Sequence, residues 1–317
     1  MDNDFHPCYN HARETAYTGT DRGRNRMEEN RSLGALQCDL HTHSVFSDGT
    51  YTPTEIVAEA ARLDLIVALT DHNTTAGLTE FKDAARKLGV TAVPGIEFST
   101  EHNGKELHLL GLFVLPEHDS VIDGMLLESL ALKERFNLKL VKNLNQAGYQ
   151  IDFESVKRRI PGGTPNRAHI AAELLDLGYV SSIQEAFDSL LNDKSGFYVR
   201  PPLLQLLDVI RQLRQIGVLP VLAHPLQELT EQELRQLLPA AKEAGLLGME
   251  TAHPSYTPER LRLAGELAAE FDLLPSGGSD FHGSVKPDIA LGTGKGQLHI
   301  PPEVYSNLLA AWEALQA

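Results

Sequence analysis

The sequence of 317 residues has few cysteines, no long apolar run and a shortage of positive charge. Its two cysteines, Cys8 and Cys38, exclude a disulfide framework and are typical of a reducing, intracellular compartment. No apolar run approaches the ~20 residues of a membrane span, and the amino-terminal segment lacks the hydrophobic stretch of a secretory signal. The 28 Lys and Arg against 43 Asp and Glu give a formal net charge of −15, whereas a duplex-DNA binder needs a basic surface. We therefore expect a cytoplasmic protein that contacts neither membranes nor duplex DNA.

The pattern of apolar residues divides the chain into a leader, an α/β domain and an insertion. Residues 1–36 show neither helical nor strand period, so we interpret them as a mobile leader. From residue 37, short apolar runs alternate with helical stretches, which predicts a parallel sheet. Seven runs read as strands, so we expect a distorted seven-stranded (β/α)7 barrel related to the TIM design, formed by residues 37–120 and 203–317. The predicted strands are 36–40, 65–69, 90–98, 105–114, 218–223, 246–251 and 273–276.

Residues 121–202 break this alternation and read as helices only, near 121–147, 153–160, 166–177 and 182–192. The segment has ten basic and ten acidic residues, so the whole net charge of −15 lies outside it. A helical insertion after a barrel strand is a candidate lid over a substrate. The alternative is a structural outgrowth without a role in the site.

Histidines and carboxylates follow almost every predicted strand. A parallel barrel places its active site at the carboxyl ends of its strands, so we expect these side chains to converge there. One histidine after a strand is usually a structural residue, but their joint occurrence favours a metal site. Glu250 and His253 follow the sixth strand and are not counted as ligands. The nine candidate ligands are His41, His43, Asp48, His72, Glu97, His108, His224, Asp280 and His282.

The number of candidate ligands predicts more than one ion. A single catalytic ion takes three or four protein ligands, so nine ligands indicate two or three ions with a bridging carboxylate. Neutral imidazole and carboxylate suit manganese, zinc or iron rather than calcium. Such ions clamp a phosphoryl group and supply a bridging hydroxide as nucleophile.

Seven motifs together resemble the polymerase-and-histidinol-phosphatase (PHP) domain family. They are His41-Thr-His43, Phe46-Ser47-Asp48-Gly49, Thr70-Asp71-His72, Gly95-Ile96-Glu97, His108-Leu-Leu-Gly111, Ala223-His224-Pro225 and Ser279-Asp280-Phe281-His282. Within this family the chain is similar to the nucleoside 3′,5′-bisphosphate phosphatases, whose relatives include a 5′→3′ exoribonuclease. The insertion carries this narrower resemblance, in residues 166–171, 178–180 and 185–187.

The resemblance implies a trinuclear centre, with manganese as the expected metal and zinc or iron as alternatives. One ion would take His41, His43, Glu97 and Asp280, a second Glu97, His108 and His224, and a third Asp48, His72 and His282. We expect Asp48, Glu97, His224 and His282 to act directly in catalysis. The family often reads His-Pro-Ser-His after the sixth strand; here the residues are His253-Pro254-Ser255-Tyr256, a departure that concerns substrate contacts rather than the metals.

The expected function is hydrolysis of the 3′-phosphate of nucleoside 3′,5′-bisphosphates. We expect Arg167, His169 and Lys194 to bind the second phosphate, since a guanidinium forms a fork to phosphate oxygens. The alternative is that Arg167 is a surface residue and His169 a packed one. Three further functions remain open: 5′→3′ exonuclease action on short 5′-monophosphorylated RNA, histidinol phosphatase, and a non-catalytic metal-containing interaction domain, which the complete ligand set disfavours. No obligate protein partner is inferred.

Overall fold

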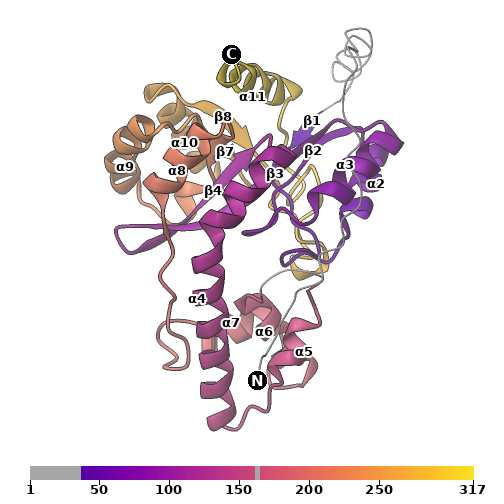
Figure 1. The fold of residues 1–317 in the computed structure, drawn as a ribbon, viewed down its shortest axis with the longest axis vertical. Helices are drawn as coiled ribbons and strands as arrows, with labels where there is room; N and C mark the ends of the chain where they lie inside the picture. Colours follow the sequence, from indigo (N-terminus) through magenta and orange to yellow (C-terminus); the bar gives the residue numbers. More distant parts are fainter. Residues whose placement is uncertain (1–36, 161–164) are drawn as a thin grey trace, which may run out of the picture. The chain divides into compact units, whose positions relative to one another are not determined.

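The structure is a computed structural model that describes residues 37–160 and 165–317. The predicted leader, 1–36, lies outside the described residues. Eight strands of this part of the chain form one sheet with the order β1-β2-β3-β4-β6-β7-β8, and β5 pairs with β3 beside this path (Figure 1). The strands are β1 (Gln37–Asp39), β2 (Leu65–Leu69), β3 (Ala92–His102), β4 (Lys105–Leu112), β5 (Leu204–Gln205), β6 (Leu219–Leu222), β7 (Gly248–Ala252) and β8 (Leu274–Gly277).

The seven predicted strands are confirmed, but the prediction of an all-parallel sheet is wrong. Strand β4 runs antiparallel to both of its neighbours, β3 and β6, while the other ladders are parallel. Asn103 and Gly104 connect β3 to β4, with φ of 51° and 77°. Two consecutive residues with positive φ form the tight turn of a β-hairpin, and Asn-Gly is its usual sequence. The hairpin therefore replaces the helical crossover that parallel strands need.

The predicted closed barrel of seven strands is also wrong. In the described residues the sheet has eight strands, and no ladder closes it between β1 and β8. These two strands have only three and four residues, which are used in pairing with β2 and β7. Backbone hydrogen bonds instead join residues at and beyond the strand ends: Leu40 N donates to Gly277 O at 3.2 Å, and Asp280 N to His41 O at 3.0 Å. The two ends of the sheet thus approach each other where the chain carries candidate ligands.

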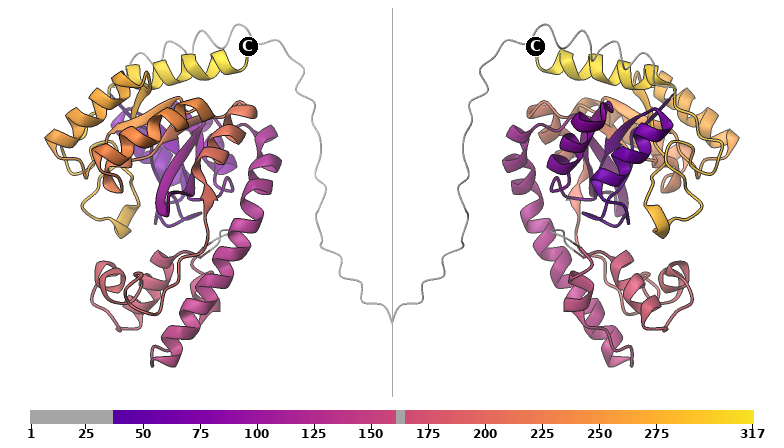
Figure 2. Two further views of the ribbon diagram at one scale, coloured as in Figure 1. Left: turned by 90° about the vertical axis from the view of Figure 1, so that its left-hand side faces the viewer. Right: turned by 90° about the vertical axis from the view of Figure 1, so that its right-hand side faces the viewer.

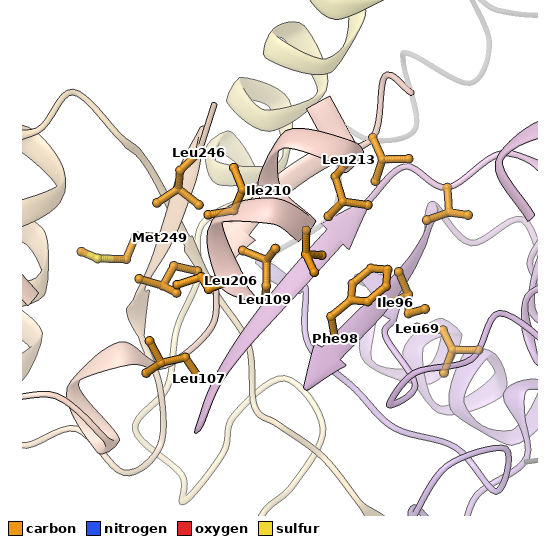
Figure 3. Close-up of a cluster of buried hydrophobic side chains, with 14 of the residues drawn as sticks. Leu69, Ile96, Phe98, Leu107, Leu109, Leu206, Ile210, Leu213, Leu246 and Met249 are labelled. Atoms are coloured by element: carbon orange, nitrogen blue, oxygen red, sulfur yellow. The ribbon is translucent and has the colours of Figure 1, made fainter. Parts of the chain in front are cut away.

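Buried side chains on both faces of the sheet explain why apolar runs identified its strands. Strand β2 is buried along its whole length, as a strand covered on both faces should be. Its alternate residues belong to two cores: Val67 and Leu69 to one, Ile66 and Ala68 to the other. Figure 3 shows part of the first core, where Leu206, Ile210 and Leu213 of α8 pack on β3 and β4, among other buried side chains.

Ten α-helices occur in the described part of the chain, and none of them is long and apolar enough to cross a membrane. α2 begins with a capping box: the Thr52 hydroxyl accepts from Glu55 N at 3.2 Å, and Glu55 Oε2 accepts from Thr52 N at 2.8 Å. The helices are α2 (Pro53–Leu63), α3 (Leu78–Leu88), α4 (Asp119–Gln146), α5 (Phe153–Lys157), α6 (Arg167–Asp176), α7 (Ile183–Ser189), α8 (Leu206–Gln215), α9 (Glu231–Ala244), α10 (Pro258–Glu270) and α11 (Pro302–Leu315).

Between β4 and β5 the described residues form the helices α4 to α7, within a few residues of the predicted bounds. The carboxyl-terminal half of α4 packs with α6 and α7 (Figure 2), and the three share a core of their own that includes Leu144, Leu174 and Ala186. This segment therefore has its own hydrophobic stabilisation. Other residues of the segment, among them Asn166, contact the loops that follow the sheet strands.

Candidate metal centre and adjoining pocket

The nine candidate ligands come from six of the strands or from the loops that follow them. Seven lie after parallel strands: two after β1, one in the loop beyond it, and one each after β2 and β6, with two after β8. Glu97 and His108 lie within β3 and β4. Because β4 is antiparallel, its first half lies beside the carboxyl-terminal half of β3, and His108 pairs with Ser99. The antiparallel direction of β4 therefore brings His108 to the edge where the other ligands lie.

The structure brings all nine together in four overlapping sets, and in each set the possible ligand atoms lie within 4.8 Å of one another. Glu97 belongs to two sets, as do His41, His43 and His72. The sets do not reproduce the expected division into three ions, because His43 also joins the set around Asp48. They are His43, Asp48, His72 and His282; His41, His43 and Asp280; His41, Glu97 and His224; and His72, Glu97 and His108.

Glu97 lies at the centre of this cluster and is fully buried. Burial alone would raise its pKa, but the surrounding imidazoles hold the pKa well below its usual range, so the carboxylate is charged. Its two oxygens face different imidazoles, which is the geometry that a bridging ligand needs. Oε1 lies 2.8 Å from His108 Nδ1 and 3.3 Å from His224 Nε2; Oε2 lies 3.1 Å from His41 Nε2, 3.2 Å from His43 Nε2 and 3.0 Å from His72 Nδ1.

The donor atoms of the cluster fit divalent ions. Among the described residues, Asp48 Oδ1, His72 Nδ1, Glu97 Oε2 and His108 Nδ1 are buried and have no hydrogen-bond partner, although some of them lie close together. Buried polar atoms are nearly always hydrogen-bonded, so four unpartnered ligand atoms in one cluster indicate a missing binding partner. Burial lowers the pKa of His72 to about 3, which keeps its ring neutral, the form that binds metals.

A second layer of buried carboxylates holds the loops that carry the ligands. Asp39 accepts from the backbone N–H groups of Ser279 and Gly292, both at 2.8 Å, and so fixes the segment around Asp280. Burial raises the pKa of Asp39. Asp39 lies two residues before the first candidate ligand, His41, and nothing in the sequence indicates that it contacts the loop of Ser279 and Gly292.

Asp71 has the same role for the loop after β1. It accepts from Ser44 N at 2.7 Å, from Ser44 Oγ at 2.6 Å and from Ser47 Oγ at 2.5 Å. Ser47 directly precedes the candidate ligand Asp48, so these hydrogen bonds fix the position of Asp48 in the loop. Asp71 stands beside His72 in the sequence, and only the three-dimensional contacts distinguish its role from that of a ligand.

Three further residues contact candidate ligands in a way that was not expected from the sequence. Glu250, in β7, contacts both His41 and His224. Lys286 Nζ lies 2.6 Å from Asp280 Oδ2, and His253 Nε2 lies 3.5 Å from the same oxygen. The carboxylate of Asp280 raises the pKa of Lys286, against the effect of burial, so the lysine is charged.

A pocket of about 170 Å³ adjoins the cluster and contains three cationic side chains. Asp48, His72 and His108 line it from the cluster, and Lys133, Arg167 and Arg200 line it from α4, α6 and the segment before β5. Burial lowers the pKa of Lys133, and the carboxylates of Asp48 and Glu106 oppose this effect. The pocket therefore places positive charge next to the candidate metal ligands.

Arg167 is held in this pocket by four groups. Its guanidinium stacks over the rings of Tyr198 and Phe187, with 4.4 and 5.6 Å to the centroids. Its Nη1 donates to Leu191 O at 3.2 Å, and its Nη2 lies 3.9 Å from Glu106 Oε2. Arg200 lies 4.0 Å from the same carboxylate. Sequence reasoning identified Arg167 but missed Lys133 and Arg200.

The other two expected phosphate contacts do not line this pocket. Lys194 is exposed, and its backbone N–H is bound to Asn192. His169 accepts from the backbone N–H of Asn166 at 3.2 Å, so it belongs to the cap of α6, and burial lowers its pKa to about 4. Neither residue lines the pocket that contains Arg167, so a role for them in phosphate binding stays a prediction.

The insertion contacts the cluster through the cap of α6. Asn166 accepts from His169 N through its Oδ1 at 3.2 Å, while its Nδ2 donates to Asp48 Oδ2 at 3.0 Å. One side chain thus caps the helix and holds a candidate ligand. Because Arg167 is the next residue, this contact also fixes the distance between the cationic pocket and the cluster.

Together, the α/β sheet, the nine donors at one edge and the adjoining cationic pocket define a candidate metal-dependent hydrolase of anionic substrates. Residues 39–193 match the model of the PHP domain, and the chain belongs to this family.

Three curated relatives, whose names describe different activities, are about equally similar to this chain in sequence. The chain is 33% identical over 246 residues to a 5′-3′ exoribonuclease of Haemophilus influenzae, covering 77% of this chain and 89% of the relative. It is 33% identical over 253 residues to a phosphoribosyl 1,2-cyclic phosphate 1,2-diphosphodiesterase of Eggerthella lenta (77% and 94%). It is 30% identical over 247 residues to a 3′,5′-nucleoside bisphosphate phosphatase of Chromobacterium violaceum (77% and 86%).

A solved structure extends the likeness to the fold. A protein of Bifidobacterium adolescentis described as a metal-dependent phosphoesterase superposes with a TM-score of 0.78 at 30% identity, covering 87% of this chain and 96% of the other. All these relatives are named for the cleavage of phosphate esters.

Proposed function

We propose that this protein is a metal-dependent phosphoesterase that removes the 3′-phosphate of nucleoside 3′,5′-bisphosphates and leaves the 5′-monophosphate. The observation that carries the proposal is the pocket in which three cations adjoin three candidate metal ligands. A substrate with two phosphates needs two anion sites at a fixed separation. The metal cluster would hold the scissile phosphate, and the cationic pocket would hold the other.

The charge of the pocket suits a phosphate monoester. Lys133, Arg167 and Arg200 supply three positive charges, and Glu106 removes one, so the side chains that line it beyond the cluster carry a net charge of about +2. A terminal phosphate with two negative charges would neutralise this charge. The forked guanidinium of Arg167 can donate two hydrogen bonds to such a group.

The nine clustered residues would hold the ions, with Glu97 as the bridging ligand. Bound divalent ions of the manganese, zinc or iron type would supply charge stabilisation and lower the pKa of a coordinated water. The chain itself fixes the ligands through Asp39, Asp71 and Glu250. Asn166 and Arg167 line the pocket beside the cluster, and this supports a role for the insertion as a substrate-binding cover.

A second candidate function uses the same two sites. In a short RNA with a 5′-monophosphate, the first internucleotide phosphodiester occupies the position of the 3′-phosphate of a bisphosphate. The 5′-phosphate would enter the cationic pocket and hydrolysis would release one nucleotide. The named activity of the Haemophilus influenzae relative favours retaining this alternative.

A product assay distinguishes these functions. The purified chain with Mn²⁺ is incubated with adenosine 3′,5′-bisphosphate, a 5′-monophosphorylated oligoribonucleotide, phosphoribosyl 1,2-cyclic phosphate and histidinol phosphate. Release of phosphate and AMP from the bisphosphate, at the highest kcat/KM of the four, supports the proposal. Preferential shortening of the RNA from its 5′ end supports the second function. Preference for either of the other two substrates contradicts both.

A further inference from the structure

The Glu250 carboxylate is fully buried and uses both of its oxygens on candidate metal ligands. Oε1 lies 3.0 Å from His41 Nδ1, and Oε2 accepts a hydrogen bond from the backbone N–H of His224 at 2.7 Å. His41 and His224 belong, with Glu97, to one of the four sets of candidate ligand atoms. One carboxylate therefore holds two members of the same set.

The ring of His41 presents its other nitrogen to the cluster. Nε2 lies 3.1 Å from Glu97 Oε2 and 3.0 Å from His43 Nε2. A nitrogen that binds a metal ion must offer a lone pair, so in the neutral ring the proton must be on Nδ1. An ionised carboxylate can only accept hydrogen bonds, so Glu250 stabilises this tautomer and disfavours the other.

We propose that Glu250 is a positioning residue that fixes His41 in the Nδ1–H tautomer and thereby prepares Nε2 to bind an ion. The proposal rests on the proposed metal-dependent function. It assigns to Glu250 a contribution to metal affinity that is separate from its contribution to the stability of the fold. Second-layer carboxylates of this kind typically change metal affinity on the order of tenfold to a hundredfold.

Glu250→Gln separates the tautomer from the shape of the side chain. The glutamine amide has one oxygen for two donors, and the backbone N–H of His224 cannot change its role. The oxygen must therefore face His224, and the NH₂ group then faces His41 Nδ1. This arrangement requires a lone pair on Nδ1 and a proton on Nε2, which is the tautomer that cannot bind an ion.

Compared with Glu250→Gln, the Glu250→Ala variant should bind the metal more tightly but unfold at a lower temperature. It opens a polar space in which a water can accept from both His41 Nδ1 and His224 N, so the metal-binding tautomer stays accessible. It also removes buried packing and a hydrogen-bond acceptor, which lowers the melting temperature more than an isosteric change does. A purely structural role would make the alanine variant worse in both measurements.

The experiment measures Mn²⁺ binding to the metal-free full chain by titration calorimetry, and thermal unfolding in EDTA. Glu250→Gln should bind Mn²⁺ on the order of tenfold to a hundredfold more weakly than the wild type, and more weakly than Glu250→Ala, while Glu250→Ala has the lower melting temperature. Glu173→Gln is the matched control, because Glu173 is a buried carboxylate that accepts from Arg159 outside the cluster. It should alter the melting temperature without changing Mn²⁺ affinity.

Two results overturn the inference by itself: Glu250→Gln with wild-type Mn²⁺ affinity, or Glu250→Ala with the weaker binding of the two variants. A wild-type chain that binds neither Mn²⁺ nor Zn²⁺ would overturn the proposed function and this inference with it. Since binding is measured directly, the choice of substrate has no influence on the result.

Discussion

Replacing Arg167 by alanine tests whether the cationic pocket holds a second phosphate. The guanidinium is only partly exposed, with 29% of its side chain accessible, and stacks on Tyr198. Because it is already ordered, little conformational entropy is lost when a phosphate binds. A hydrogen bond to a charged group is worth about 1.5–3 kcal/mol, but Glu106 partly neutralises Arg167 before binding, so we use the lower half of this range.

The expected result is a loss of kcat/KM on adenosine 3′,5′-bisphosphate of roughly tenfold to fiftyfold in Arg167→Ala. Activity on p-nitrophenyl phosphate should change less than twofold or so, because this substrate has no second phosphate to bind. Arg167→Lys should fall between the wild type and the alanine variant, since it keeps the charge and loses the fork.

Lys194→Ala is the control, since Lys194 is an exposed cation of the same insertion that does not line the pocket. It should keep wild-type kcat/KM on both substrates. An equal loss on both substrates in Arg167→Ala would refute the reasoning, because the residue would then support the fold or contact the scissile phosphate. A loss in Lys194→Ala as large as that in Arg167→Ala would show that the pocket is not the phosphate site.

Three other predictions concern the metals, the pocket and a longer substrate. Glu97→Ala should lose more bound metal than any other single-ligand variant, measured by elemental analysis, because both of its oxygens face imidazoles of different sets; retention of wild-type metal content contradicts this. Burial lowers the pKa of Lys133, so its charge is lost at a lower pH than that of an exposed lysine, and KM for the bisphosphate should rise at alkaline pH in the wild type but not in Lys133→Met. If short RNA is bound through its 5′-phosphate in the pocket alone, one phosphate is neutralised and the slope of log K against log salt should be roughly −0.7; a much steeper slope contradicts this.

The strands and the cluster of candidate ligands could be predicted because both follow from the position of the buried apolar runs in the sequence. A strand buried on both faces is an apolar run, as in β2, and the residue that follows it lies at the carboxyl edge of the sheet. His72 illustrates this: it lies three residues after the end of β2, and its Nδ1 is 3.0 Å from Glu97 Oε2. No pairing information is needed for such a residue, since a parallel sheet aligns its carboxyl ends.

The direction of β4 and the open sheet were not predictable from the same rule. The Asn103-Gly104 pair is a hairpin signal in the sequence, and it conflicts with the expectation that the strand after it is parallel. Whether a sheet closes depends on pairing between its first and last strands, which are far apart in the sequence. The residues that contact each other there, such as His41 and Asp280, are joined by backbone groups that carry no sequence signal.

The second layer and the pocket were missed for a related reason. Glu250, Lys133 and Arg200 act through neighbours that lie far away along the chain, and no spacing or motif connects them. Lys194 was expected beside Arg167 because both are cations of the insertion, but it lies in the turn after α7 and does not line the pocket. The presence of two cations in one insertion is therefore weak evidence that they share a site.

The net charge of the whole chain is negative, whereas the pocket beside the candidate metal ligands is positively charged. The net charge of −15 argues against a surface that follows a polynucleotide, and the basic run Lys157–Arg159 agrees with this, because each of its side chains is paired with a carboxylate. The pocket is the exception, where three cations and one carboxylate of the lining, Glu106, lie beside the metal ligands. A ligand is attracted by the positive charge of the pocket only if its own negative charges lie close together and can enter the pocket and the cluster. Nucleotides with two phosphates and the 5′ ends of short RNAs have this property, and long nucleic acids gain nothing further from their length.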